Sequence, residues 1–146
     1  VDKDGSLILK RDYDPSIPEI YGDEDLFIQA ILNIVKNAQQ ALLLTTNPVI
    51  TIKSRVSYSQ PINGNLHPTL CEVSIIDNGP GIPTDIQEQV FFPMVSSKEH
   101  GSGLGLSISQ DIIRIHGGAI TFKTKSGETA FSIQIPIKLN TEVQSA

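Results

Sequence analysis

The chain has a single cysteine, no long apolar run and no surplus of basic residues. Cys71 has no partner for an internal disulfide, which is typical of proteins from a reducing compartment. No stretch approaches the roughly 20 apolar residues that span a bilayer. The formal net charge of −5 argues against nucleic acid, whose phosphates require a clustered basic surface. The composition therefore favours a cytoplasmic protein that binds neither membrane nor nucleic acid.

An initial methionine and a secretory signal pattern are also lacking, and we interpret the chain as a piece of a longer polypeptide. Its 146 residues suffice for one domain with a buried core. We expect this single domain to have its core at about residues 11–138 and a disordered tail at 139–146.

Hydrophobic periodicity predicts the secondary structure. The expected strands are 6–13, 49–57, 70–77, 119–124 and 129–137, and the expected helices are about 23–44, 84–91 and 103–116. In the last helix, Leu104, Ile108, Ile112 and Ile115 are expected to point inward. Helices interleaved with antiparallel hairpins predict an α/β protein, a two-layer sandwich. We expect the sandwich to contain a mixed, mostly antiparallel sheet of about five strands, covered on one face by about three helices.

The first chemical signal is a glycine-rich segment at 101–106, which reads Gly101-Ser102-Gly103-Leu104-Gly105-Leu106. Alternate glycines leave backbone N–H groups unobstructed, and a helix is expected to begin at once. Free N–H groups at a helix N-terminus form an anion site, for which phosphate is the natural occupant. A flexible hinge without a ligand is the alternative interpretation.

Asp77 and Thr129 are polar residues on otherwise apolar strand faces. Asp77 continues the alternation of Cys71, Val73 and Ile75, so its carboxylate is expected to be buried and to need a donor, such as the exocyclic amine of adenine. Alternatively, it starts the following turn by accepting a hydrogen bond from Gly79 N–H. Thr129 leads an apolar face in the same way, although β-propensity alone explains a threonine there.

Asn33 and Asn37 lie four residues apart and therefore on one side of the first long helix. Asparagine is disfavoured inside helices, so two in register at the edge of the core indicate a ligand. A neutral amide oxygen suits Mg²⁺, which prefers hard oxygen donors. The alternative is a hydrogen bond from the helix to a loop.

These motifs occur in an order that resembles the catalytic, ATP-binding domain of sensor histidine kinases. The five boxes of that family, called N, G1, F, G2 and G3, are matched by residues 32–38, 77–82, 91–94, 101–106 and 127–131. The resemblance covers about residues 11–138 and implies the Bergerat-type ATP-binding fold. Three stretches, 11–18, 33–42 and 92–98, are most similar to the NtrB branch of the family, which serves nitrogen regulation.

The resemblance implies a function for each matched position. Asn37 would hold Mg²⁺, Asp77 would accept the adenine amine, and residues 101–106 would bind the phosphates of ATP. The implied nucleotide-binding residues are Asn33, Asn37, Asp77, Gly79, Gly81, Ile82, Gly101, Ser102, Gly103, Leu104, Gly105, Leu106 and Thr129.

The chain departs from the family pattern at two basic positions. Gln40 stands where a lysine is common, and the F box lacks its usual arginine. Lys98 is our candidate substitute for neutralising phosphate charge, and it and Asn33 are the candidate catalytic residues. A solvated lysine in a polar loop is the alternative.

The resemblance implies a kinase that transfers the γ-phosphate to a histidine on a separate dimerisation domain. His67, His100 and His116 do not lie mid-helix beside an acidic partner, so none is a good acceptor. Related ATPases, including gyrase, carry a glutamate general base where Asn33 stands, and asparagine cannot accept the proton. We therefore expect slow hydrolysis of ATP. Because dimerisation in this family belongs to the separate histidine-bearing domain, we expect this domain to be a monomer. The resemblance also implies an NtrC-like response regulator downstream of the full-length protein.

Two other functions fit the same sequence. One is an anti-sigma-type serine kinase. The other is a non-catalytic ATP-sensing module, which fits a chain that lacks the family's basic residues at Gln40 and in the F box.

Segment 93–103 is polar and is expected to act as a lid that the γ-phosphate orders. By resemblance, a PII-type regulator could bind at this lid.

Overall fold

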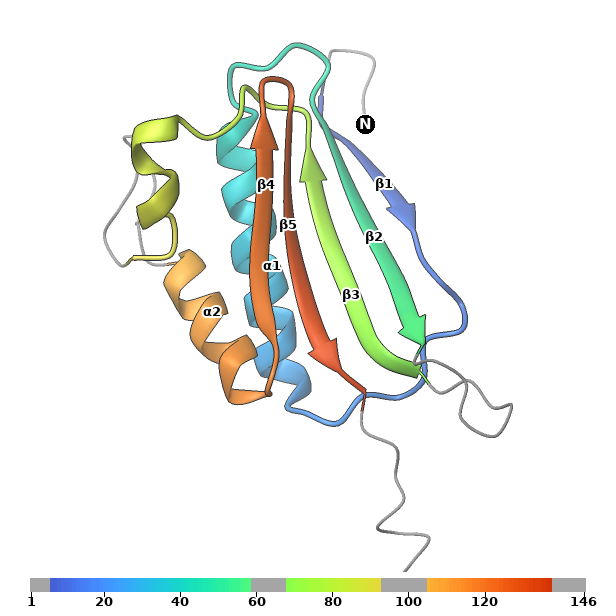
Figure 1. Ribbon diagram of the computed structural model, residues 1–146. Helices are drawn as coiled ribbons and strands as arrows, with labels where there is room; N and C mark the ends of the chain where they lie inside the picture. Colours follow the sequence, from blue (N-terminus) through green and yellow to red (C-terminus); the bar gives the residue numbers. More distant parts are fainter. Residues whose placement is uncertain (1–5, 59–67, 93–104, 138–146) are drawn as a thin grey trace, which may run out of the picture.

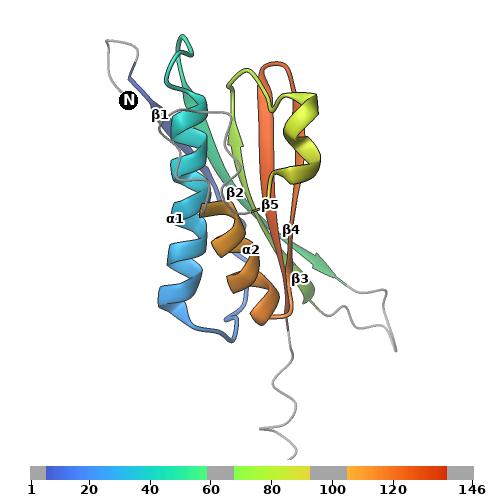
Figure 2. The same ribbon diagram turned by 90° about the vertical axis from the view of Figure 1, so that its left-hand side faces the viewer.

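The computed structural model describes residues 6–58, 68–92 and 105–137. It contains one sheet formed by β1 (Ile8–Asp12), β2 (Val49–Tyr58), β3 (Pro68–Asp77), β4 (Ala119–Lys125) and β5 (Glu128–Pro136). The strand order is β1-β2-β3-β5-β4, in which β1 runs parallel to β2 and every other neighbouring pair is antiparallel. Helices α1 (Glu24–Ala41) and α2 (Gly105–Ile115) lie on one face of the sheet (Figures 1 and 2). This confirms the predicted α/β architecture.

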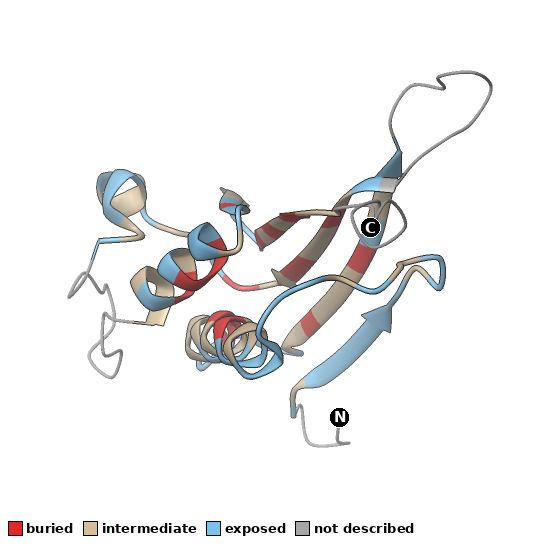
Figure 3. Ribbon diagram, turned by 90° about the horizontal axis from the view of Figure 1, so that it is seen from below, coloured by how far each residue is buried: buried red, intermediate tan, exposed pale blue. Residues whose placement is uncertain are grey.

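Side chains along the inner strands point alternately toward the helices and toward the opposite, more polar face of the sheet. Ile50, Ile75 and Ile133 belong to the buried core cluster that also contains residues of both helices. Buried positions alternate with less buried ones along β5, since strand residues two apart share a face (Figure 3). On the opposite face, the hydroxyls of Ser74 and Ser132 lie 2.9 Å apart across β3 and β5. The period of two therefore determines which face of the sheet forms the core.

A 3₁₀ helix, η1 (Thr84–Gln89), follows the turn after β3. The chain then returns to the core through Phe91, whose ring packs edge-on against Phe122 and Phe131 at centroid distances of 6.0 and 6.1 Å. These aromatic contacts fix the segment between the predicted G1 and F boxes to the helical side of the sheet.

Helix α1 begins and ends for local reasons. Asp23 caps it, since the Asp23 Oδ1 atom accepts a hydrogen bond from Leu26 N–H at 3.1 Å, and acidic residues occupy the first turn. The helix ends at Ala41, three residues before the predicted Leu44, whose side chain is 100% exposed and has no core to pack against. Within the described residues, no helix is both long and apolar enough to cross a membrane.

The predicted inward face of α2 is confirmed at Ile112 but wrong at Ile108 and Ile115. Ile115 is 75% exposed and Ile108 also faces solvent, whereas Ser109, Ile112 and Ile113 are buried. The completely buried Ser109 donates its hydroxyl to the carbonyl of Ala30 on α1 at 2.8 Å. A small side chain at this point lets the two helices approach closely. The buried face of α2 is therefore rotated about the helix axis relative to the face predicted from its apolar residues. Leu104 lies outside the described residues.

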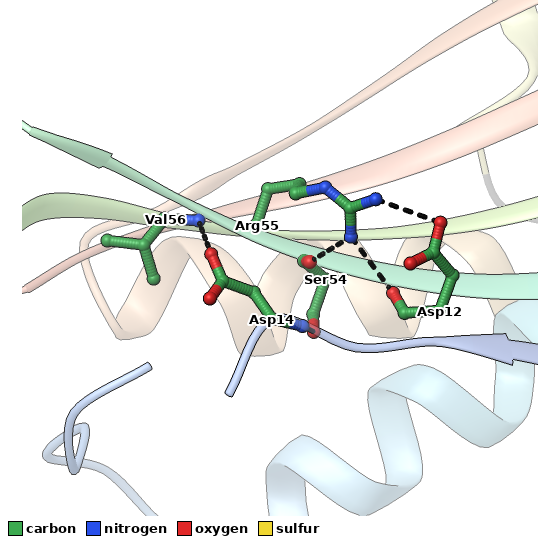
Figure 4. A network of polar contacts seen from close by, with 5 residues as sticks. All are labelled: Asp12, Asp14, Ser54, Arg55 and Val56. Atoms are coloured by element: carbon green, nitrogen blue, oxygen red, sulfur yellow. Dashed lines mark hydrogen bonds and ion pairs between the residues drawn. The ribbon is translucent and has the colours of Figure 1, made fainter. Parts of the chain in front are cut away.

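At the end of β1 and just beyond it, side chains join the chain to β2 (Figure 4). The Asp14 carboxylate accepts hydrogen bonds from Ser16 and from Val56 N–H, and the Arg55 guanidinium donates to Asp12 at 2.8 Å. The hydrogen bond from Arg55 lowers the pKa of Asp12, and the hydrogen bonds from Ser16 lower that of Asp14. These contacts extend the attachment of the edge strand to the sheet.

Candidate functional site

The buried end of β3 carries the first candidate residue. Asp77 is 2% exposed and lies on the core face of β3, as the alternation predicted. Its Oδ1 atom accepts a hydrogen bond from Gly79 N–H at 2.9 Å, so the turn contact considered from the sequence is present. A carboxylate has about four lone-pair sites, so this bond is compatible with a further donor at the same group.

Asp77 is paired across the sheet with Thr129, which is 3% exposed. The Thr129 Oγ1 atom lies 2.8 Å from Oγ1 of Thr124, and Thr124 in turn accepts a hydrogen bond from Ile82 N–H at 2.9 Å. Two threonine hydroxyls thus connect the β4–β5 hairpin to the segment that follows Asp77. Thr124 was not among the predicted site residues. A signal for it is present in the sequence, since Thr124 ends the apolar alternation of Ile120 and Phe122.

The turn between β3 and η1 requires its glycines. Gly81 has a φ of +93°, and a Cβ atom there would come within 2.6 Å of the carbonyl oxygen of Lys125. A Cβ at Gly79 would meet the carbonyl oxygen of Ala41 at 3.1 Å. The turn is therefore wedged between the C-terminal end of α1 and the β4–β5 hairpin.

The second glycine motif meets the asparagine-bearing helix. A Cβ atom at Gly105, the first residue of α2, would lie 3.5 Å from the Cβ atom of Asn33. Asn37, one turn further along α1, is half-buried, as is Leu106, which packs against the core. The start of α2 therefore lies beside the middle of α1.

The structure thus brings together most of the residues singled out in the sequence. Asn33 and Asn37 share a helix that ends against the Gly79 turn, and Gly105 adjoins the same helix at Asn33. Ile82 is half-buried and packs against the core beside the threonine pair. The other predicted positions, Lys98, Gly101, Ser102, Gly103 and Leu104, lie outside the described residues.

The oxygen atoms of this site suit a Mg²⁺ ion that takes most of its coordinating oxygens from bound phosphate and water. Within the described residues, no cluster of three or more histidine, cysteine or acidic side chains is arranged to hold a metal ion. Protein sites for Mg²⁺ commonly supply one or two oxygens and leave the remaining positions to phosphates and water. The amide oxygen of Asn37 is a donor of that kind.

Comparisons with known proteins identify the family of the chain. Residues 22–139 match the family described as "Histidine kinase-, DNA gyrase B-, and HSP90-like ATPase". The sensory histidine kinase/phosphatase NtrB of Vibrio alginolyticus is 48% identical over 132 residues, which are 90% of this chain and 38% of that protein. The chain thus spans little more than a third of the relative's length.

Solved structures give the same result. The catalytic domain of the histidine kinase ThkA superposes with a TM-score of 0.72 at 29% identity, covering 90% of this chain and 79% of that one. ThkA in complex with the response regulator protein TrrA superposes with a TM-score of 0.70 at 28% identity, over 90% of this chain and 34% of that one. On the family match, the chain belongs to the histidine kinase-, DNA gyrase B- and HSP90-like ATPases.

Proposed function

We propose that this chain binds Mg·ATP as the catalytic domain of an NtrB-like sensor histidine kinase. The observation that carries the proposal is the position of α1 between the two glycine motifs. Gly105 adjoins Asn33 and Gly79 adjoins Ala41, and these two α1 residues are about 12 Å apart at a rise of about 1.5 Å per residue. In the proposal, the base of the nucleotide binds at the Gly79 end and the phosphates bind at the Gly105 end.

At the base end, Asp77 supplies a buried acceptor for the exocyclic amine of adenine. Guanine presents an oxygen at the corresponding position, so the carboxylate selects against it. Thr129 lies opposite Asp77 in the sheet and offers a hydroxyl to the same base edge. Gly79, Gly81 and Ile82, in the turn that follows Asp77, are the further residues that we assign to this end.

At the phosphate end, the N–H groups at the start of α2 favour negative charge. Residues 101–106 bind the phosphates, and Asn37 holds the metal ion through its amide oxygen. When bound, Mg²⁺ neutralises charge on the β- and γ-phosphates. Lys98 adds a positive charge in place of the missing arginine of the F box.

Asn33 occupies the position at which a general base would act on water. Its amide takes up no proton at neutral pH, so it orients the nucleotide without promoting hydrolysis. Catalysis then rests on positioning and on charge neutralisation, and the γ-phosphate is kept for transfer.

The phosphate acceptor is a histidine on a dimerisation domain of the same kinase. The further partners we propose are an NtrC-like response regulator and a PII-type regulator that contacts segment 93–103. The isolated domain is a monomer in this proposal, since dimerisation belongs to the histidine-bearing domain.

Transfer in trans tests the proposal. This chain is mixed with a separately produced histidine-bearing hairpin of an NtrB kinase and with γ-labelled ATP, and Asp77→Asn serves as the control. We expect label on the hairpin that is lost in acid, as phosphohistidine is, and much less label with the variant. Acid-stable label would indicate a serine kinase, and binding of ATP without any label would indicate a sensing module. Either result would refute the proposed transfer.

A further inference from the structure

Asn78, between the proposed base-binding residues Asp77 and Gly79, makes a three-point attachment to the start of β2. Its Oδ1 atom accepts a hydrogen bond from Val49 N–H at 2.7 Å, and its Nδ2 atom donates to the carbonyl of Asn47 at 3.0 Å. Its own backbone N–H donates to the carbonyl of Val49 at 3.3 Å. The side chain therefore continues the β2–β3 ladder beyond its last pair, Ile50 with Asp77.

Only a short side chain with both an acceptor and a donor can make both side-chain contacts. Aspartate retains the acceptor for Val49 N–H but faces the Asn47 carbonyl with a second acceptor. Alanine loses both contacts, and glutamine is one methylene too long for the same reach. The amide at position 78 is thus matched to the loop between α1 and β2.

That loop has a fixed conformation at the point of attachment. Asn47 has a φ of 54°, a left-handed conformation that asparagine tolerates better than most residues. On the other side of the turn, Gly79 adjoins the carbonyl of Ala41, where α1 ends. The turn at 77–79 is therefore held from both sides by the segment that joins the asparagine helix to β2.

We propose that Asn78 is a positioning residue for base recognition. It holds the turn in which the Asp77 carboxylate accepts a hydrogen bond from Gly79 N–H, and so fixes the orientation of this carboxylate toward the adenine amine. The inference rests on the proposed function, because it concerns the same nucleotide site. In this inference, the attachment of Asn78 to Asn47 and Val49 sets the preference of the site for adenine over guanine.

The test compares the dissociation constants of Mg·ATP and Mg·GTP for wild type, Asn78→Ala and Asn78→Asp. With the turn released, Asp77 is no longer fixed, so we expect ATP affinity to fall about threefold to tenfold in Asn78→Ala, the effect of one or two lost hydrogen bonds. GTP affinity should change less, so that the ATP/GTP ratio narrows. Asn78→Asp, which keeps the contact to Val49, should show a smaller change in the same direction.

A matched control separates positioning from stability. Ser132→Ala removes the Ser74–Ser132 hydrogen bond on the opposite face of the sheet, three residues from Thr129. It should lower the melting temperature and leave the ATP/GTP ratio unchanged. A merely structural role of Asn78 would give the same pattern as this control.

Each outcome has a defined meaning. A wild-type chain that does not prefer ATP would overturn the proposed function and this inference together. A selective wild type with an unchanged ratio in Asn78→Ala would overturn the inference alone. If Asn78→Ala does not fold, the ratio in Asn78→Asp decides, and an unchanged ratio there overturns the inference.

Discussion

At the scale of single residues, Asp77 has the most direct role in the proposed site. Asp77→Asn retains an oxygen that can accept from Gly79 N–H, but it can place an amide donor against the adenine amine. A mispaired buried polar group costs about 1–3 kcal/mol, so ATP affinity should fall about 5- to 150-fold. Discrimination against GTP should shrink as well. Calorimetry that shows unchanged ATP binding in the variant would mean that adenine binds elsewhere.

Asn37→Ala tests the metal ligand. The variant should lose most of the gain in ATP affinity that Mg²⁺ provides, because the amide oxygen is removed, and binding without metal should change less. Titrations with and without Mg²⁺ measure both effects, and Gln39→Ala, an exposed substitution on the same helix, is the control. An equal loss in the two conditions would indicate a structural asparagine.

His116 joins the end of α2 to the start of α1. Its Nδ1 atom lies 2.8 Å from the carbonyl of Ile112 and so carries the proton, while Nε2 accepts from Asp23 N–H at 3.1 Å. His116→Phe keeps a ring beside Phe27, which lies at a centroid distance of 4.2 Å and a tilt of 40° in the wild type, but removes both hydrogen bonds. We expect a loss of about 1–2 kcal/mol in unfolding free energy.

The control for this loss is Ile115→Ala, which alters an exposed neighbour and should shift stability by no more than about 0.5 kcal/mol. Thermal denaturation measures both variants. Equal melting temperatures for His116→Phe and wild type would show that the ring contact alone joins the helices.

At the scale of elements, the contacts that follow β1 predict a pH dependence. The pKa of Asp14 is lowered in the folded chain, chiefly by its hydrogen bonds to Ser16. A carboxylate with a lowered folded pKa stabilises the fold above its unfolded pKa of about 4 and loses that contribution as pH falls through the folded value. The difference in melting temperature between wild type and Asp14→Asn should therefore be larger at pH 6 than at pH 3. A constant difference across this range would contradict the role of the charge.

The elements themselves were largely predictable, and α2 shows where prediction failed. Its isoleucines at 108, 112 and 115 form a regular stripe, but of these only Ile112 is buried, and the packed face is completed by Ser109 and Ile113. A buried serine that donates to a neighbouring helix carries no hydrophobic signal, so periodicity alone placed Ile108 and Ile115 inward in place of Ser109 and Ile113. Asp77 was found because it interrupted an apolar strand face, and Thr124 could have been found by the same rule. Asn78 could not, since its partners are backbone groups 29 and 31 residues away.

At the scale of the whole molecule, Cys71 reports on the opening of the sheet. It is buried in β3, and burial, followed by the nearby charges of Asp14 and Glu72, raises the pKa of its thiol. Labelling by a thiol reagent should therefore be slow in the native chain and fast in denaturant. If labelling requires global opening, a ligand that binds only the folded state slows it by about 1 + [L]/Kd.

Labelling of Cys71 with increasing Mg·ATP should follow that factor. A rate that saturating ATP leaves unchanged would show that the thiol is reached through a local opening that does not involve the nucleotide site. Asp77→Asn provides the matched control, because its rate should respond to ATP only at higher concentrations.

The parallel pairing of β1 has a mechanical consequence. β1 begins at one end of the sheet and β5 ends at the other, so tension applied through these two ends acts along the strands (Figure 1). Under that load, the pairs from Ile8–Val49 to Asp12–Lys53 are sheared together instead of opening one after another. The hydrogen bonds of Arg55 and Asp14 resist the same displacement. Although every side chain of β1 is exposed, this edge strand would therefore resist detachment along its whole length.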